Sequence, residues 1–367
     1  MAKSVYIADV CKEIFAGGDV PKSALSYEKT AEYNVPIFSN GEKNCGLYGY
    51  TNNARLKEPS ITVSARGTIG YTAIRTEPFV PVVRLITLTP KSEVIDLDYL
   101  FYATQNYKFE GSGTSIPQLT VPMLKKYAFP LPELEEQKAI AKLFQKLDCL
   151  ISLRKQQLAK LDELVKARFV EMFGDISNSR KVPMQDVCKI ITDGTHQPPK
   201  FVLSGIPFLF VSNIVTNEIH YDAEKFISEE TYNELIKRTP IEVGDVLLST
   251  VGSYGHPAVV KENKPFCFQR HIAYLKPNNS VVNSEYLRCA ILSTDLQRQI
   301  DESVKGIAQK TLNLSEIRKL RLPLPSLSLQ NQFAAFVERI DQQKQTVQQS
   351  LEKLELMKKA LMQKYFG

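Results

Sequence analysis

The residues of this chain that are best suited to chemistry form incomplete versions of known catalytic patterns. The segment HQPPKF at 196–201 resembles the Asn/Asp-Pro-Pro-Tyr/Phe clamp that holds a target adenine in DNA methyltransferases. However, Gln197 replaces the leading acid or amide, and Lys200 separates the prolines from the aromatic ring, so a proline turn is the better interpretation. Glu262 and Lys264 form half of a nuclease E-x-K motif, but no Pro-Asp pair precedes them. Because two-metal cleavage needs carboxylates that converge on the ions, we expect no catalytic residue in the chain.

The histidines and cysteines give no metal or disulfide pattern. The four histidines have no shared spacing, and the six cysteines form no CxxC pair, which argues against both a zinc site and a disulfide framework. We expect reduced, mostly buried thiols. No GxxxxGK(S/T) phosphate loop is present, which excludes a nucleotide-driven motor. The sequence therefore predicts no metal and no cofactor bound by this chain.

Length and composition indicate a folded protein of two or three domains. The chain has 367 residues, of which 43% are hydrophobic and 23% are charged, as expected for globular proteins with a core. It has no apolar run of 18 residues, and its N-terminus lacks the pattern of a secretory signal, so we expect a cytoplasmic protein. A net charge of +6 permits nucleic-acid binding but does not require it.

The elements that must position any site occur twice in the sequence. Residues 129–174 align with residues 322–367 without a gap, and the identical residues include Leu134, Gln137 and Asp148. Each copy begins with a short strand that ends in Phe-Pro-Leu-Pro (129–132) or Leu-Pro-Leu-Pro (322–325), where proline prevents further strand pairing and favours a turn into a helix. An internal duplication at this distance predicts two homologous structural units.

Each copy continues as one long helix. No Gly or Pro interrupts 133–173 or 326–366, and apolar residues recur at alternating spacings of three and four. The expected seam includes Leu147, Leu158, Leu161, Ile340, Leu351 and Leu354. At 1.5 Å per residue each helix is about 60 Å long. We predict that the two helices pair as an antiparallel coiled-coil spacer; the alternative is that they are ordinary core helices of two separate domains.

The segments between the helices are rich in short strands and also repeat. SARGTIG at 64–70 matches STVGSYG at 249–255, and Gln118 matches Gln309. PSITVSA, FVPVVRLITL, GDVLLST and HIAYLKP are expected strands, whereas LDYLFYATQNYKF and SEYLRCAILSTDLQRQI are expected helices opened by Asp or Ser caps. We therefore predict an α+β fold. It has two globular domains with small, mostly antiparallel β-sheets, separated by two long antiparallel coiled-coil helices in a pseudo-two-fold arrangement.

The expected boundaries follow from the repeat. The first globular domain covers residues 1–130 and the first spacer helix residues 131–180. The second globular domain covers 181–322 and the second spacer helix 323–367.

This order of elements, with PLPELEEQKAIAKLFQKLD and GDVLLSTVGSYG, resembles the specificity subunit of type I restriction-modification enzymes over essentially the whole chain. The resemblance implies a non-catalytic protein with two target recognition domains, each reading one half of an asymmetric, split site in double-stranded DNA. It also implies two methyltransferase subunits that use S-adenosylmethionine and dock on the helices, and restriction and translocase subunits that use ATP and Mg. We expect the docking surface on the helix pair and on the Leu-Pro segments that precede each helix, including outward residues near Gln137 and Gln330.

Base reading needs side chains with paired donors and acceptors, and phosphate contacts add hydroxyl groups and backbone amides. The candidates in the first domain are polar residues in glycine-containing loops, namely Lys43, Asn44, Tyr48, Tyr50, Asn52, Asn53, Arg55, Arg66 and Thr68. Those in the second domain are Thr195, His196, Gln197, Lys200, Asn213, Ser253, Tyr254, His256, Gln269, Arg270 and His271. The matching Gln118 and Gln309 favour a shared structural or phosphate-positioning role. For each residue taken alone, a solvated turn is the alternative.

Two other functions remain open at this point. One is the recognition part of a related restriction system whose partner combines methyltransferase and nuclease, since the sequence does not distinguish the partner. The other is a coiled-coil scaffold that does not bind DNA, which predicts no salt-dependent DNA affinity.

Overall fold

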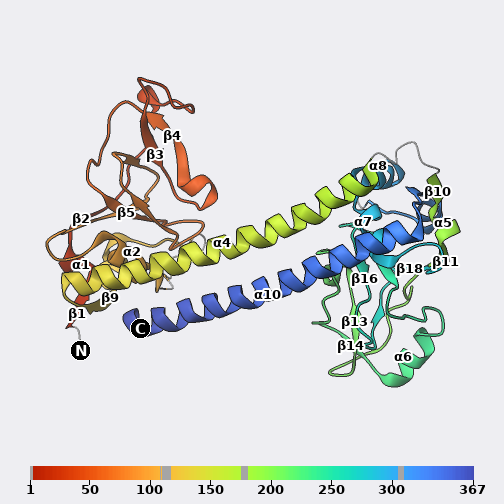
Figure 1. Ribbon diagram of the computed structural model, residues 1–367. Coiled ribbons are helices and arrows are strands. Elements are labelled where there is room, and N and C mark those ends of the chain that lie inside the picture. The colour runs from red at the N-terminus through yellow and green to blue at the C-terminus, as the bar shows by residue number, and fades with distance from the viewer. Residues whose placement is uncertain (1–2, 108, 110–116, 175–180, 305–309) are drawn as a thin grey trace. The chain divides into compact units, whose positions relative to one another are not determined.

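The computed structural model describes residues 3–107, 109, 117–174, 181–304 and 310–367 (Figure 1). The chain divides into two compact units, the first formed by Met1–Gln156 and Gln348–Gly367 and the second by Gln157–Val347. Gln309 lies outside the described residues.

The first unit is built on a four-stranded antiparallel sheet. The strand order is β2 (Cys11–Ala16), β8 (Ile86–Pro90), β5 (Ser60–Val63) and β6 (Thr72–Arg75). A second sheet contains β4 (Leu47–Thr51), β3 (Val35–Phe38) and β7 (Val80–Pro81), in which β3 and β7 run parallel. A third pairs β1 (Lys3–Tyr6) with β9 (Ala128–Leu131). The short helices are α1 (Ile7–Val10), η1 (Lys22–Ala24), η2 (Lys43–Gly46), α2 (Leu97–Gln105) and α3 (Val121–Leu124).

The second unit repeats this plan. Its four-stranded sheet has the order β11 (Cys188–Asp193), β18 (Ile272–Pro277), β15 (Val246–Ser249) and β16 (Pro257–Val259). The next sheet contains β12 (Phe201–Val202), β14 (Phe226–Ile227), β13 (Ile206–Leu209) and β17 (Cys267–Phe268), and β10 (Lys181–Pro183) pairs with β19 (Arg321–Pro323). The short helices are α5 (Met184–Val187), η4 (Val211–Asn213), α6 (Glu229–Leu235), α7 (Ser284–Ile291), α8 (Thr294–Ser303) and α9 (Leu314–Lys319). The α+β prediction with small sheets is confirmed.

The two long helices are α4 (Leu134–Phe173) and α10 (Leu327–Phe366), each of 40 residues (Figure 1). They run antiparallel within each unit. In the first unit Lys155 pairs with Glu355 at 3.0 Å, and Asp148 pairs with Lys358 at 2.6 Å. In the second unit the seam lies among Leu161, Ile340 and Val347, with Leu158, Val165 and Phe336 packed against them. The predicted pair of antiparallel helices is thus confirmed.

The other predicted seam residues also face protein. Leu147 and Leu354 pack in the core of the first unit, and Leu351 is buried. Charged residues at seam positions find acidic partners, since Lys344 pairs with Asp162 at 2.8 Å. Lys358 pairs with Asp148 in the same way. Ion pairs therefore replace apolar contacts at two steps of the seam.

Three expectations about single elements are wrong. The segment 284–300 forms two helices, because the Ser293 side chain accepts a hydrogen bond from the Leu296 backbone N–H and starts α8. The first of them, α7, is capped by Asn283 and not by Ser284. The run FVPVVRLITL is two strands, β7 and β8, because Val83 and Arg84 adopt φ of 53° and 68°. Of the cysteines, Cys11, Cys267 and Cys289 are buried and Cys188 is half-buried, whereas Cys45 and Cys149 are exposed.

Candidate nucleic-acid interface

In the first unit several loops meet where β5 ends and β8 begins. We call this set rim 1; it comprises Gly17–Gly18, Asn40–Gly46, Ser64–Gly70, Val83–Arg84 and Gln118–Leu119. Asn40 joins two of the loops, because its Nδ2 donates to the Val83 carbonyl at 2.6 Å and its Oδ1 accepts from the Ala65 N–H at 2.7 Å. The Leu119 N–H donates to the Ala65 carbonyl at 2.9 Å. Rim 1 is therefore one hydrogen-bonded surface.

An arginine on rim 1 is held in a defined direction. Arg66 is exposed, and its Nε and Nη2 donate to Gln118 Oε1 at 3.0 and 2.7 Å. The guanidinium group keeps its remaining donors for a ligand, since arginine has five N–H groups in a fixed fork. Both residues were predicted site residues, and the structure brings them together.

The buried side chain of Arg75 holds the loop Lys43–Gly46 in place. Arg75 is 8% exposed and donates to the Cys45 carbonyl at 2.7 Å and to Thr62 Oγ1 at 3.1 Å. Its guanidinium group lies 3.6 Å from the centre of the Phe38 ring, and burial lowers its pKa. Asn44 has a φ of 51°, a conformation that costs energy in residues other than glycine. Arg75 thus stabilises a loop that presents Lys43 and Asn44 to solvent.

The second unit has a corresponding set of loops. Rim 2 comprises Gly194–Thr195, Thr250–Gly255, Gln269–His271 and Lys310–Leu312. The Arg270 N–H donates to the Thr195 carbonyl at 3.0 Å, and the Thr250 N–H donates to the His271 carbonyl at 2.9 Å. The Leu312 N–H donates to the Thr250 carbonyl at 2.8 Å. These bonds link all four segments.

The two rims share a hairpin. In the first unit the Gly70 N–H donates to the Ser64 carbonyl at 2.9 Å, and in the second the Gly255 N–H donates to the Ser249 carbonyl at 2.9 Å. Gly67 and Gly252 take φ of 67° and 71° in the equivalent turns, which glycine does without strain. The frame is the same, but the side chains differ: Arg66 occurs where the second copy has Val251.

Rim 2 carries histidine, tyrosine and arginine side chains. Arg270 and Ser253 are exposed, and Tyr254 Oη donates to Asp301 at 3.0 Å. His256 directly follows rim 2 in the chain; its Nδ1 lies 3.3 Å from Asn217 Oδ1, and burial lowers the pKa of this imidazole. Burial and the neighbouring Arg270 also lower the pKa of His271.

Several predicted residues lie away from the rims of the first unit. Asn52 and Asn53 follow β4 at the end of the β3–β4 hairpin that is remote from Lys43, because Thr51 pairs with Val35 there. Arg55 lies over the Phe15 ring and 3.9 Å from Glu13. Tyr48 and Tyr50 lie on β4, where the Tyr48 ring is 6.2 Å from Tyr27 and the Tyr50 backbone pairs with Ser26.

In the second unit, some predicted residues have internal partners. Asn213 is 9% exposed, and its amide makes hydrogen bonds to the backbone of Phe210, His220 and Asp222 at 2.9, 3.0 and 3.2 Å. This commitment favours a structural role. His196 lies 2.8 Å from Asp193, which Arg238 also contacts at 2.6 Å. Gln197 and Lys200 are exposed on the loop before β12.

The described backbone gives Gln118 a different counterpart from the one expected from the sequence, and Gln309 itself lies outside the described residues. Leu119 and Leu312 make the equivalent hydrogen bonds to Ala65 and Thr250, which places Gln118 opposite Thr311. The matching positions in the second copy are Val251 and Thr311, so these two described residues differ from the Arg66–Gln118 pair.

Sequence reasoning missed two residues of rim 1. Asn40 links its own loop to the turn between β7 and β8 through its hydrogen bond to Val83, and Arg84 is exposed on that turn. A signal for Arg84 was available: aligning LTP at 88–90 with LKP at 275–277 places Arg84 opposite His271. The backbone supports this equivalence, since Leu85 and Ile272 make matching turns with Val82 and Gln269.

Among the described residues, no group of three or more His, Cys, Asp or Glu is arranged to hold a metal ion. No helix in the described ranges is long and apolar enough to cross a membrane.

Comparison with known proteins identifies the repeated unit. The model of the type I restriction modification DNA specificity domain matches residues 2–163 and again residues 177–356. The chain belongs to this specificity family. Each match contains one rim and the greater part of one long helix.

Related specificity proteins agree in sequence and fold. Two Mycoplasma pneumoniae proteins named as type I specificity subunits are 38% and 40% identical over 145 and 139 residues, which is 40% and 38% of this chain. These alignments span 43% and 38% of the relatives' own length, less than half. The Escherichia coli EcoBI specificity subunit is 22% identical over 314 residues, covering 76% of this chain and 66% of that one. A type I S subunit from M. genitalium has a TM-score of 0.60 at 17% identity and covers 100% of this chain and 96% of its own; this last likeness concerns the fold.

Proposed function

We propose that this chain is the DNA specificity subunit of a type I restriction-modification enzyme. It reads a bipartite, asymmetric site in double-stranded DNA, with one half-site bound by each unit. It performs no catalysis itself, and an adenine methyltransferase partner that uses S-adenosylmethionine modifies the site that it selects. Restriction and translocase subunits that use ATP and Mg complete the system.

The observation that carries this proposal is the pair of rims. Each is a set of loops fixed by backbone hydrogen bonds at the same end of an equivalent four-stranded sheet. A shared frame with different side chains is what two unequal half-sites require, because backbone contacts position a protein and side chains distinguish bases. Two separate matches to the DNA specificity domain support the same conclusion.

The rim residues are the proposed contacts with base edges and nearby phosphates. In the first unit they are Lys43, Asn44, Arg66, Thr68, Arg84 and Gln118, and in the second Thr195, Ser253, Tyr254, Gln269, Arg270 and His271. Arginine can bind guanine O6 and N7 with two hydrogen bonds, which is the commonest specific contact in the major groove. The exposed predicted residues outside the rims, such as Arg55 and Lys200, are proposed to contact phosphates.

The methyltransferase is proposed to dock on the helix flank that does not pack on the sheets. In the second unit this flank contains a groove between α4 and α10, lined by Leu164, Ala167, Arg168, Gln332, Ala335 and Phe336 among others. In the first unit Leu150 and Leu153 are exposed on α4. Exposed apolar side chains beside charged ones suit a protein partner. Gln137 and Gln330 themselves are buried and are not part of this surface.

The decisive experiment maps N6-methyladenine across the genome of a bacterium that expresses the chain together with a type I methyltransferase. The expected result is one motif with two unequal half-sites separated by a fixed unspecified gap. A matched culture with the methyltransferase alone is the control. Methylation at a continuous site, or at the same sites without this chain, contradicts the proposal.

Binding measurements separate the remaining alternatives. DNA affinity of the purified complex should fall steeply between 50 and 200 mM salt, because phosphate neutralisation releases counterions. A coiled-coil scaffold shows no such slope. Cleavage by the same polypeptide that methylates would instead indicate the combined methyltransferase-nuclease system.

A further inference from the structure

The first turn of each long helix contains a glutamine whose side chain is enclosed by protein. Gln137 is 1% exposed and Gln330 is 0% exposed. Gln137 Oε1 accepts from the Asp96 N–H at 2.9 Å, and its Nε2 donates to the carbonyls of Val94 at 3.1 Å and Pro132 at 2.9 Å. The Gln137 amide thus links the Leu-Pro segment before α4 and the first turn of α4 to the segment that caps α2.

The second copy makes the same three bonds. Gln330 Oε1 accepts from the Asn283 N–H at 2.8 Å, and its Nε2 donates to Val281 at 3.2 Å and to Pro325 at 2.9 Å. Asp96 and Asn283 are the N-cap residues of α2 and α7. The duplication has therefore kept a complete contact set around each amide.

A tyrosine from the same short helix makes a second tie. Tyr99 Oη donates to the Pro130 carbonyl and Tyr286 Oη to the Pro323 carbonyl, each at 2.6 Å. Both tyrosines are buried in the core of their unit. We call the pairs Gln137 with Tyr99 and Gln330 with Tyr286 the root latches.

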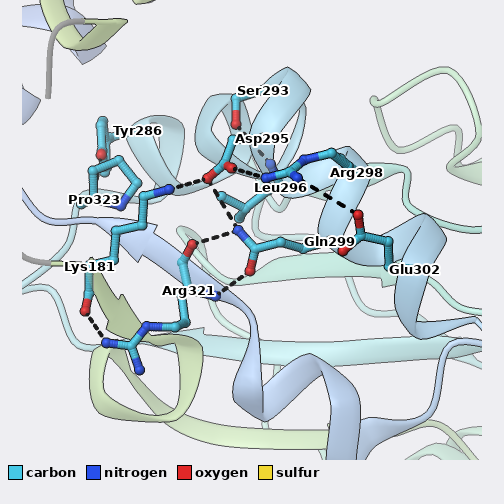
Figure 2. Close-up of polar contacts among 10 residues, drawn as sticks. All are labelled: Lys181, Tyr286, Ser293, Asp295, Leu296, Arg298, Gln299, Glu302, Arg321 and Pro323. Carbon is cyan, nitrogen blue, oxygen red and sulfur yellow. Dashed lines mark hydrogen bonds and ion pairs between the residues drawn. The ribbon is translucent and has the colours of Figure 1, made fainter. Parts of the chain in front are cut away.

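In the second unit a polar network reinforces the root (Figure 2). The Gln299 side chain donates to the Arg321 carbonyl at 2.9 Å and accepts from its N–H at 2.9 Å, which satisfies the free edge of β19. Lys181 on β10 pairs with Asp295 at 2.8 Å, and Arg321 Nη2 donates to the Lys181 carbonyl at 2.6 Å. The strand that leads into α10 is held on both sides.

We propose that the root latches fix the angle between each recognition unit and its long helix, and so set how strictly the enzyme measures the gap between half-sites. This inference rests on the proposed function and names Gln137, Tyr99, Gln330 and Tyr286 as positioning residues. They touch no DNA and act through the geometry of the unit.

A small change of angle at the root is enough to shift a rim by one base pair. Each rim lies at the end of strands of four to six residues, or about 13–20 Å from the far end of the sheet. A rotation of about 10–15° at the root moves such a point by about 3.4 Å, which is the rise of one base pair. Hydrogen bonds that hold the root to within a few degrees are therefore needed to distinguish gaps that differ by one base pair.

The test compares methylation of DNA duplexes that carry both mapped half-sites at the native gap or with one base pair added or removed. Gln137→Met and Gln330→Met remove the amide but keep a similar volume. In the full chain with its methyltransferase, we expect preference for the native gap to fall about tenfold while the bases required in both half-sites stay the same. Gln343→Met, at an exposed position on α10, is the matched control and should keep the preference.

Milder variants guard against loss of folding. Tyr99→Phe and Tyr286→Phe remove one hydroxyl each from the same latches, and thermal unfolding of every variant is measured alongside. Folded latch variants of both kinds with an unchanged gap preference overturn the inference and leave the proposed function intact. A native chain that directs no bipartite methylation overturns both.

Discussion

At the scale of single residues, some rim residues hold the loops in place and others project from those loops into solvent. Asn40 and Arg75 hold the loops of rim 1 through backbone carbonyls and N–H groups. Arg66 and Arg270 project from equivalent frames and have exposed guanidinium groups. Under the proposed function, the base contacted by one side chain can therefore change without a change in the loops that hold it.

Replacing one exposed arginine should relax one half-site only. Arg66→Ala is expected to reduce discrimination at one base of the first half-site by about 1–3 kcal/mol, the value of a bidentate contact. Arg270→Ala should do the same in the second half-site. Genome-wide methylation maps of the two variants provide the measurement, and each variant is the control for the other. Loss of methylation at all sites alike would instead indicate a phosphate contact.

Protonation of a partly buried histidine should weaken the second unit. Because burial lowers the folded-state pKa of His256 below the unfolded value of about 6.5, its contribution to stability is present above that value. It is lost as the pH falls through the folded pKa. The denaturant midpoint should therefore drop between pH 8 and pH 5.5, and less so in His256→Gln. The difference between the two proteins at pH 8 gives the effect of packing alone, and an identical pH slope would exclude this titration.

The sequence marked some of these residues without showing their role. Gln137 and Gln330 stood out because they repeat, and both are buried; the docking surface expected on outward residues near them stays a prediction. Repetition reveals that a contact is required but not whether its partner is protein or solvent. Asn40 was missed because its partners, Val83 and Ala65, lie 43 and 25 residues away, and no local pattern marks such a contact.

At the scale of elements, long periodic patterns were predicted most accurately. The expected helices over 133–173 and 326–366 differ from α4 and α10 by one residue at the start, because Pro before each helix and continuous apolar periodicity define both. The helix expected over 284–300 was wrong since apolar spacing continues through Leu292 while Ser293 caps a new helix. Local capping overrides periodicity when the two conflict.

The seam of the second unit should be a measurable source of stability. Leu161→Ala and Ile340→Ala each remove a buried side chain from the contact between α4 and α10. Each is expected to lower the free energy of unfolding by about 2–4 kcal/mol, measured by denaturant titration. Leu356→Ala is the control, since that side chain is 67% exposed and should change stability by no more than about 0.5 kcal/mol. Equal effects for all three variants would mean that the helices do not depend on this seam.

At the scale of the whole molecule, helix length should determine the gap. Inserting one heptad after Gln156 and another after Val347 adds about 10 Å to each helix and keeps the seam residues in register with each other. We expect the unspecified gap to lengthen by no more than about 3 base pairs, with both half-sites unchanged in methylation maps. The same insertion in α4 alone offsets the seam and should reduce methylation. An unchanged gap between the half-sites in the double-insertion variant would contradict the prediction that helix length sets this gap.

The ends of the long helices have a consequence for the order of assembly during synthesis. Phe366 is buried in the first unit, where its ring centre lies 5.1 Å from that of Tyr99 and 5.7 Å from that of Phe144. In the second unit, Phe173 occupies the equivalent place beside Tyr286. On the ribosome, Phe173 precedes the unit that needs it, but Phe366 follows its unit by about 200 residues. At about 5–20 residues per second, the first unit waits roughly 10–40 s with its aromatic core open. The half of the protein that is made first is thus the last to be completed, and it is the half that should depend on chaperones in the cell.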